Sequence, residues 1–560
     1  MTENTVSALR RLVRLKNVLG TDVAAEKLAL LRTLERGRLP RATDVARLHE
    51  VLCFMRAYPD NAEQLAMVER ILDNFTQRKD LIRHRQALMD SGIAGTAIYY
   101  SFYWLTARWL LKNWPGAISI DWSAFDQQDQ LEEWLPLLLP LPDALGVDSL
   151  TLSPKEWIDK LKDPTETDAA FLIRRFEKWH VDHDTCEKIY EDLDVPLCLE
   201  PGANTPSRTH SKYTPARIVF EDPVQTRPLV SVYERLHYQP LSRREVSTRE
   251  GQRLIDLARV QMITRSRDLF AFMNADCRDV QVLDYDDGLQ FVCYGLRPEQ
   301  RLLLEAMYVF VILKNGVPIG YTQASTLFRS AEINFNVFDT FRGTETSWVF
   351  LTTLSMVRNL FASDTFIINP QQLGEDNPEA LKSGAFWFYY KHGFRPKHCA
   401  VRKVMKTELA RKKSNPGHRS SLATLKRLSV DNLFFYLDKR RDDVISRINN
   451  EGIGRAYAHV FANQGGAQQE RALRDCAQQV AQRVGLSSLN NLTRPQRMAW
   501  NRWSPMLVAL PGLSRWSDAN KRALIEIIKA KAGRREIEYV NLFDRHPLLP
   551  KVIWKLSRTE

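Results

Sequence analysis

The spacing of apolar residues changes in the middle of the chain, and this change restricts the possible folds more than any other feature. Helical spacing of about 3.6 residues prevails towards both ends, whereas the part from Val280 to about Met405 has short apolar runs and alternating segments. In Glu332–Val337 polar and apolar residues alternate strictly, which places the three apolar side chains on one face of a strand. The sequence therefore predicts a central sheet between two helical regions.

The central part is expected to alternate between strands and helices. Lys314–Gly316 supplies turn residues between two apolar runs, a pattern that is typical of a β-hairpin. The expected elements are the strands Val309–Leu313 and Pro318–Leu327, the strand Glu332–Val337, a helix over 344–361, the strand Thr365–Asn369, a short helix ending at Lys391-His392-Gly393-Phe394, and a last strand or pair of strands from about His398. This order indicates a mixed sheet with helices packed on it.

The length of 560 residues corresponds to about three to five domains. Five prolines between Glu200 and Pro228 mark the clearest linker. The expected regions are an N-terminal helical region 1–95, an aromatic-rich helical region 96–200, a Pro-rich linker or irregular connection 201–239, the sheet domain 240–408, and a basic connection with a C-terminal helical domain 409–560. The fold class is predicted to be α/β (α+β), with large all-α regions on both sides of the sheet domain.

Cysteine content and hydropathy bear on the compartment in which the protein works. Seven cysteines, an odd number without a Cys-x-x-Cys pair, favour a reducing compartment over a disulfide framework. The first residues lack an apolar segment followed by small residues, so no secretory signal is expected. The longest apolar stretch, Ile93–Leu111, contains Arg108 and falls short of the roughly 20 residues of a membrane span, so we expect a buried helix. A cytoplasmic protein that does not bind membranes is therefore predicted.

Motifs for several other chemistries are weak or missing. His180, His183 and Cys186 have helical spacing, but no fourth ligand is near them in the sequence, and no metal site is predicted. The sequence contains neither a GxxxxGK[ST] phosphate loop nor a GxSxG elbow. Nucleotide hydrolysis and serine-hydrolase chemistry are therefore not expected.

Two stretches of the sheet domain carry a family resemblance. The first, Asn336–Ser347, is a strand that runs into an Arg-Gly turn and a helix. The second, Ala385–Pro396, is an aromatic helix in which Tyr389 stands four residues before Gly393. In composition, order and spacing these stretches resemble the GNAT superfamily of acyl-CoA-dependent N-acyltransferases. The resemblance covers about 240–408 and implies a GNAT-like acyltransferase domain that uses acetyl-CoA or another acyl-CoA as co-substrate.

The first stretch has the elements of an anion-binding site. A strand that turns at Gly343 and starts a helix presents unpaired N–H groups, and the helix dipole adds about half a positive charge there. The resemblance implies that these amides and Arg342 hold the pyrophosphate of coenzyme A, while the pantetheine arm lies along the strand that ends at Val337. The cofactor-binding residues expected on this basis are Val337, Arg342, Gly343, Thr344, Thr346, Ser347, Asn377 and Lys391. An ordinary capped helix start is the alternative interpretation of the Arg-Gly turn.

Glu345 departs from the family pattern, which usually has a small residue at this position. A carboxylate in the first turn favours a helix by about 0.3 to 1 kcal/mol. Beside a pyrophosphate, however, it would add repulsion of at least similar size. We therefore expect the Glu345 side chain either to turn away or to weaken cofactor binding.

Acyl transfer to an amine needs one group that takes a proton from the amine and another that gives a proton to the leaving thiolate. Glu332, on the polar face of the strand, is the candidate for the first role, and a solvent-facing or salt-bridged carboxylate is the alternative. The resemblance assigns Tyr389 to the thiolate, whereas core packing is the other explanation for such an aromatic helix. A backbone N–H near Val337 is a candidate oxyanion donor.

Three functional hypotheses follow from these observations. The leading one is N-acyl transfer from an acyl-CoA, acetyl-CoA above all, to an amine-bearing acceptor that is a protein or a small molecule. The second, motivated by Glu345, is a catalytically inactive GNAT-fold binding or scaffold protein. The third follows from charge, because Arg395–Val430 contains eleven basic residues and one acid, Glu408. Such a run is typical of a solvated face or linker, or of a contact to RNA or DNA phosphates through Arg395–Arg427.

Overall fold

The chain forms two compact units. The computed structural model describes residues 2–149, 152–220, 231–343, 345–463 and 469–558. Unit 1 consists of Met1–Thr226, Arg253–Met273 and Leu313–Pro318, and unit 2 consists of Arg227–Gln252, Asn274–Ile312 and Ile319–Glu560. Within the predicted linker 201–239, residues 221–230 lie outside the described residues, and Val232–Arg235 forms the short helix α12.

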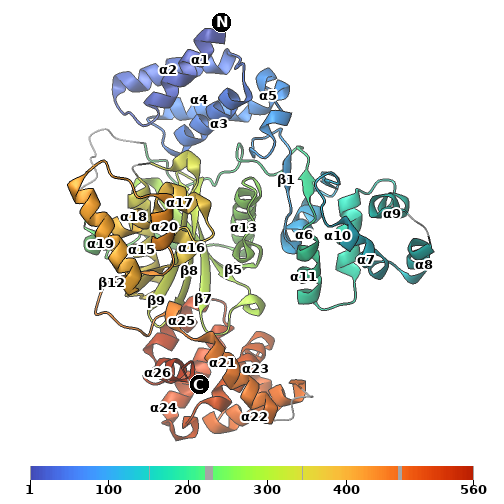
Figure 1. The fold of residues 1–560 in the computed structure, drawn as a ribbon, viewed down its shortest axis with the longest axis vertical. Helices are drawn as coiled ribbons and strands as arrows, with labels where there is room; N and C mark the ends of the chain where they lie inside the picture. Colours follow the sequence, from blue (N-terminus) through green and yellow to red (C-terminus); the bar gives the residue numbers. More distant parts are fainter. Residues whose placement is uncertain (1, 150–151, 221–230, 344, 464–468, 559–560) are drawn as a thin grey trace. The chain divides into compact units, whose positions relative to one another are not determined.

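Unit 1 is built mainly from helices (Figure 1). They are α1 (Thr2–Leu15), α2 (Thr21–Arg36), α3 (Ala42–Ala57), α4 (Ala62–Asp73), α5 (Lys79–Arg83), α6 (Trp104–Asn113), α7 (Gln128–Leu138), α8 (Leu141–Ser149), α9 (Pro154–Leu161), α10 (Asp168–Lys178), α11 (His183–Leu193) and α14 (Phe270–Met273), while α13 (Thr248–Ile263) belongs to both units. Ser153 forms a capping box with Glu156, and Pro154 occupies the first turn of α9. The Ser-Pro pair therefore starts this helix in the way that its residue types favour.

Three short strands in unit 1 correct the prediction that the N-terminal flank is all-α. The strands β1 (Ile98–Tyr100), β2 (Ile118–Ile120) and β3 (Leu197–Leu199) form an antiparallel sheet in the order β1-β3-β2. β1 lies inside Ile93–Leu111, the stretch expected to be one buried helix, and only the later part of that stretch is in α6. The branched and aromatic residues of β1 suit a strand, and pairing with β3 decides between the two structures.

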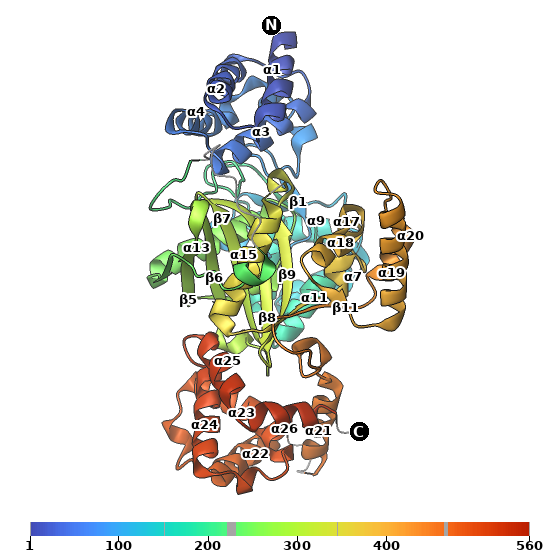
Figure 2. The same cartoon turned by 90° about the vertical axis from the view of Figure 1, so that its left-hand side faces the viewer.

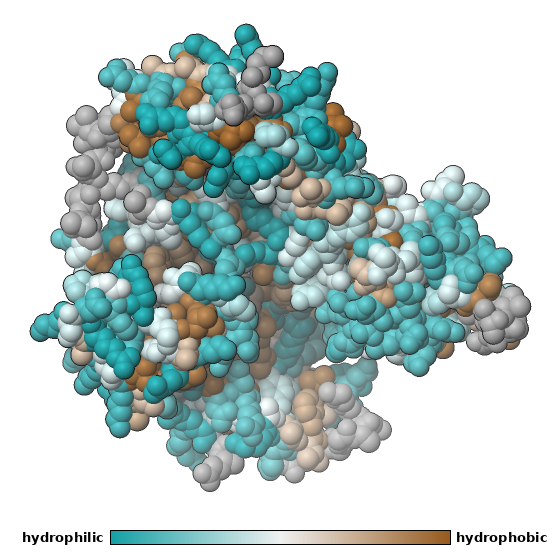
Figure 3. All heavy atoms as spheres, turned by 45° about the horizontal axis from the view of Figure 1, so that its top comes forward, coloured by the Kyte–Doolittle hydropathy of each residue, from teal (hydrophilic) through white to brown (hydrophobic). Residues whose placement is uncertain are grey.

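Most large apolar side chains of this region are buried. Trp104, Phe176 and Tyr190 are each at most 2% exposed, and their rings pack against one another. On the surface seen in Figure 3, hydrophilic side chains predominate and hydrophobic ones lie in scattered groups. Among the residues that the structure describes, no helix is both long enough and apolar enough to cross a membrane.

Unit 2 contains the predicted mixed sheet, apart from the hairpin tip Leu313–Pro318, which belongs to unit 1. Its strands are β4 (Ser242–Glu245), β5 (Ala275–Asp284), β6 (Leu289–Leu296), β7 (Ala306–Lys314), β8 (Val317–Leu327), β9 (Ser330–Val337), β10 (Thr365–Ile368), β11 (Arg395–Pro396) and β12 (Leu433–Tyr436), in the order β11-β12-β10-β9-β8-β7-β6-β5-β4. β9 and β10 are parallel, whereas β8 pairs antiparallel with β9, and β12 pairs antiparallel with both β10 and β11. The coarse prediction of a mixed α/β fold is confirmed.

The predicted β-hairpin is formed by β7 and β8. Its turn residues Asn315 and Gly316 both have positive φ, of 50° and 77°, as the two central residues of a type I′ turn require. The helix predicted over 344–361 is α15 (Thr346–Phe361), and the short helix predicted to end at Lys391-His392-Gly393-Phe394 is α18 (Ala385–Lys391). The local sequence pattern alone thus predicts the hairpin and these two helices.

Helices cover the part of the sheet around β9. The other helices of unit 2 are α16 (Pro370–Leu373), α17 (Pro378–Ser383), α19 (Cys399–Ser414), α20 (Leu422–Leu428), α21 (Asn450–Asn463), α22 (Gln469–Val484), α23 (Arg494–Ala509), α24 (Asp518–Lys531), α25 (Glu536–Arg545) and α26 (Leu549–Leu556). Phe335 of β9 packs against Phe350 of α15 and Phe388 of α18, with ring centroids 5.1 and 6.5 Å away. The apolar face predicted for Glu332–Val337 is therefore the face that meets these helices.

The prediction of a last strand or pair of strands from about His398 is wrong, because Cys399 begins the helix α19. Val401, Met405 and Glu408 are buried at spacings of four and three residues, as one face of a helix requires. The sheet instead takes β12 from beyond residue 408, and this strand lies between β10 and β11.

The C-terminal helices are joined to the sheet through buried polar groups. Figures 1 and 2 show α21–α26 gathered at one end of the sheet. Trp503 of α23 donates to the backbone oxygen of Leu303 at 2.9 Å, just before β7.

On β5, Asp279 is 1% exposed and accepts a hydrogen bond of 2.7 Å from the Tyr308 hydroxyl. Burial raises the pKa of Asp279 to about 6, against the lowering effect of this hydrogen bond.

The raised pKa of Asp279 predicts a pH dependence of stability. An unfolded aspartate titrates near 3.9, so between about pH 4 and 6 the folded protein binds more protons than the unfolded chain. The contribution of this group is fully present below about pH 4, and the free energy of unfolding falls by roughly 3 kcal/mol as the pH rises to about 6. Urea denaturation of Asp279→Asn across this range should lack that fall. Parallel pH curves for the two proteins would contradict the assignment.

Candidate functional site

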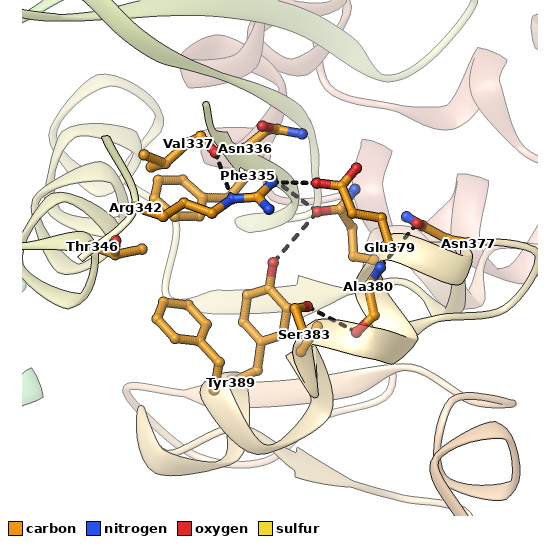
Figure 4. Close-up of a pocket in the computed structure, with 13 residues that line it drawn as sticks. Phe335, Asn336, Val337, Arg342, Thr346, Asn377, Glu379, Ala380, Ser383 and Tyr389 are labelled. Atoms are coloured by element: carbon orange, nitrogen blue, oxygen red, sulfur yellow. Dashed lines mark hydrogen bonds and ion pairs between the residues drawn. The ribbon is translucent and has the colours of Figure 1, made fainter. Parts of the chain in front are cut away.

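A pocket of about 210 Å³ lies where β9 and β10 separate. The two strands pair in parallel only from Ser330↔Thr365 to Glu332↔Ile367, and β9 then continues to Val337 while β10 ends at Ile368. The pocket is lined by Phe335, Asn336, Val337, Arg342, Thr346, Gln372, Asn377, Glu379, Ala380, Ser383, Ala385, Phe388 and Tyr389. These residues come from the end of β9, the turn that leads into α15 and its first residue, and the segment from α16 to α18 (Figure 4).

The register of β8 and β9 determines which backbone groups face this pocket. Gly320 lies opposite Val337, and the N–H of Phe338 donates to the backbone oxygen of Ile319 at 2.9 Å. This arrangement makes Gly320–Val337 a non-hydrogen-bonded pair, so the N–H and C=O of Val337 point away from β8. The same orientation holds two residues earlier, at Phe335.

Two side chains bond to this edge of β9. Gln372 Oε1 accepts a hydrogen bond from the N–H of Phe335 at 3.1 Å, and Arg342 Nε donates to the C=O of Val337 at 2.9 Å. The Tyr389 hydroxyl points to the same Gln372 oxygen at 3.4 Å, which is long for an O–H···O bond (Figure 4). The pairing with β10 does not reach this part of β9. The Phe335 N–H and the Val337 C=O are therefore hydrogen-bonded to side chains instead of a neighbouring strand.

The charge of Arg342 is balanced by two carboxylates. Its Nη1 lies 2.6 Å from Asp339 Oδ1, and its Nη2 bonds to Glu379 of α17. The Arg342 side chain is 39% exposed, so these pairs are partly screened by solvent. A phosphate group that binds Arg342 must therefore compete with Asp339 and Glu379.

The start of α15 forms only part of the expected anion site. The N–H of Gly343 donates to Thr346 Oγ1 at 3.1 Å, so this amide already has an acceptor. Thr346 lines the pocket, whereas Ser347 is exposed and is not part of the lining. Thr344 lies outside the described residues. Glu345 occupies the N-cap position of α15 without a side-chain capping bond.

Tyr389 is the most deeply buried polar group of the pocket. It is 3% exposed, and its ring packs against Phe350 with centroids 5.4 Å apart. Burial raises the pKa of its hydroxyl well above the ordinary value, so this group keeps its proton at neutral pH. A buried, protonated hydroxyl that points into a pocket can donate a proton or a hydrogen bond to a bound molecule.

The other predicted residues lie beside the pocket or serve local structure. Glu332 does not line it, and its carboxylate accepts a hydrogen bond of 2.9 Å from Asn369 Nδ2. Asn377 lines the pocket, but its side chain caps α17 by accepting from the N–H of Ala380 at 3.1 Å. Lys391 is exposed and is not a lining residue. The structure thus brings together Val337, Arg342, Thr346, Asn377 and Tyr389, and leaves Glu332, Gly343, Ser347 and Lys391 outside the lining.

Sequence reasoning missed Gln372 and Glu379. Asn369 Oδ1 accepts from the N–H of Gln372 at 3.0 Å, and Pro370 occupies the first turn of α16. The Asn-Pro pair is a helix-start pattern that could have predicted α16 and placed Gln372 in its first turn. The direction in which Gln372 points depends on how α16 packs, and no local pattern contains that information.

No protein-family model, curated protein or solved structure matches this chain. Within the part of the chain that the structure describes, no group of three or more His, Cys, Asp or Glu side chains is arranged to hold a metal ion.

Proposed function

We propose that this protein is an N-acyltransferase that takes an acyl group, acetyl in the simplest case, from acyl-CoA and transfers it to an amine. The observation that carries the proposal is the edge of β9, where Gln372 and Arg342 bond to the backbone of Phe335 and Val337. The pantetheine arm of CoA is an extended chain with secondary amides. Its C=O and N–H groups can replace the Gln372 oxygen and the Arg342 N–H at this edge, in the manner of an added strand.

The residues around the edge support roles in acyl transfer. As the N–C bond forms and the C–S bond breaks, the amine loses a proton and the thiolate gains one. The Tyr389 hydroxyl is suited to donate to the thiolate, and the Val337 N–H to stabilise the oxyanion. Glu332 lies outside the pocket lining, so its proposed role as proton acceptor requires an intervening water. Arg342 and Thr346 remain the proposed pyrophosphate contacts, which requires Arg342 to leave the Val337 carbonyl and both carboxylates.

Removal of the Gln372 side chain should tighten the binding of acetyl-CoA. Gln372→Ala frees the Phe335 N–H, and the ligand no longer has to displace a hydrogen-bonded side chain, so we expect roughly 3- to 10-fold higher affinity. Gln371→Ala is the matched control, because Gln371 is exposed and does not line the pocket. Titration calorimetry of both variants measures the effect. Equal affinities would show that Gln372 does not occupy the ligand's position.

The activity itself is tested by release of free CoA thiol from acetyl-CoA in the presence of amine acceptors. The panel should contain a polyamine, free amino acids, lysine-containing peptides and peptides with a free N-terminus. We expect at least one class to raise thiol release well above the rate without acceptor. Binding of acetyl-CoA without transfer to any acceptor would instead favour the second candidate.

That second candidate is a binding or scaffold protein with this fold and without catalysis. This candidate is supported by the anion site, whose groups already have partners within the protein. Asp339 and Glu379 both pair with Arg342, and Thr346 Oγ1 accepts the hydrogen bond of the Gly343 N–H. The two candidates differ in whether a bound thioester is cleaved.

A further inference from the structure

The helix pair α19 and α20 presents a strongly basic surface, and Figure 2 shows the two helices side by side at the edge of the sheet domain. Its exposed cations are Arg402, Lys403, Lys406 and Lys413 on α19, Arg419 in the connection, and Lys426 and Arg427 on α20. Within the described residues none of these seven side chains forms an ion pair, whereas the neighbouring Arg411 pairs with Glu408 at 2.8 Å. We call these seven residues the basic face.

The one acid in this segment faces inward. Glu408 is 1% exposed, and its carboxylate accepts hydrogen bonds from Arg411, from His418 at 2.9 Å and from Ser420 at 2.6 Å. These bonds hold the connection between α19 and α20. Glu408 therefore serves the local structure, and its charge is not available to neutralise the basic face.

The cations of α19 lie in a row. Arg402, Lys406 and Lys413 follow one another at intervals of four and seven residues, which places them within about 40° on one side of the helix over roughly 16 Å. Such a row suits a regular series of phosphates better than a single small anion, whose binding needs cations that converge on one point.

The aromatic rings near this face are already occupied by cations. Lys412 Nζ lies 3.4 Å from the centroid of the Trp387 ring, and Arg395 Cζ lies 3.9 Å from the centroid of the Tyr390 ring. The Trp387 indole N–H also donates to Ser420 at 3.0 Å. Free aromatic faces are the usual platform for single-stranded bases, and here these two rings are engaged within the protein.

We propose that the basic face binds the phosphate backbone of double-stranded DNA. An exposed helix with a row of cations fits the major groove of B-form DNA, which is about 12 Å wide, whereas the major groove of A-form RNA is too narrow to admit it. The exposed carboxylates Glu375 and Asp376 precede α17, which packs against α20, so the DNA is expected to follow α19. This inference does not depend on acyl transfer.

Fluorescence anisotropy with a labelled duplex of about 20 base pairs tests the proposal with the full-length protein. At low salt the triple variant Arg402→Gln, Lys406→Gln and Lys413→Gln should bind about 10- to 100-fold more weakly than the original protein. The slope of log K against log salt should become shallower by about 1 for each contact removed. Glutamine keeps the helix propensity, and circular dichroism verifies that the variant is folded.

A matched triple variant separates local binding from net charge. Arg10→Gln, Arg14→Gln and Arg522→Gln remove the same number of exposed cations from α1 and α24, and should leave the affinity within about twofold. The pair Lys426→Gln and Arg427→Gln on α20 should weaken binding less than the α19 triple variant, because the DNA is expected to follow α19. The proposal is overturned if the original protein does not bind the duplex at low salt, or if both triple variants lose affinity equally. Tighter binding of single-stranded DNA, duplex RNA or vesicles of acidic phospholipid would also overturn it.

Discussion

Tyr389→Phe is expected to lower the rate of acyl transfer by about 100-fold and to change the affinity for acetyl-CoA by less than about threefold. The substitution removes one buried hydroxyl that points into the pocket and keeps the ring that packs against Phe350. A proton donor acts only when the C–S bond breaks, so its loss should affect turnover more than binding. Steady-state kinetics for turnover and calorimetry for binding measure the two effects separately.

Tyr390→Phe is the control for this experiment. Tyr390 is the next residue in α18, but it does not line the pocket, and the Arg395 guanidinium lies over its ring. Its replacement should leave turnover nearly unchanged. Equal losses in both variants, or a loss at Tyr389 that appears only as weaker binding, would show that the hydroxyl does not act on the leaving group.

Gly320→Ala is expected to destabilise the protein by about 2 to 3 kcal/mol and to abolish acetyl-CoA binding. A Cβ at Gly320 would stand 2.3 Å from the backbone oxygen of Asn336 and 3.0 Å from Val337 Cα. Neither atom can move without shifting the end of β9, which carries the edge groups of the pocket. Urea denaturation measures the loss of stability, and calorimetry measures the loss of binding.

Gly343→Ala is the matched control for Gly320. A Cβ at Gly343 would meet no atom within 4 Å, so the same added methyl group should leave stability almost unchanged. If both glycine variants were equally stable, the close approach of β8 to the end of β9 would not control the geometry of the pocket.

Local sequence pattern predicted the elements that are determined by their own residues. Alternation in Glu332–Val337 gave β9 with the correct buried face, and the turn residues Asn315 and Gly316 gave the β7–β8 hairpin. The pattern failed where pairing with distant segments decides the structure. β1 is a strand because it pairs with β3, roughly a hundred residues away.

The same distinction between local pattern and distant packing applies to the residues of the candidate site. Tyr389 and Arg342 were found because they stand beside recognisable local patterns, a helix end and an Arg-Gly turn. Gln372 and Glu379 were not found, because their contacts with β9 and Arg342 arise from the packing of α16 and α17. Glu332 was assigned from strand alternation, which gives the face of a residue but not its distance from the pocket.

The central claim is that the separated edge of β9 accepts a CoA thioester by exchanging two side-chain hydrogen bonds for ligand amides. Calorimetric titration of the full-length protein with acetyl-CoA tests this claim most directly. We expect saturable binding with a dissociation constant below about 1 mM, and tighter binding in Gln372→Ala. Absence of saturable binding in both proteins at this concentration would contradict the account.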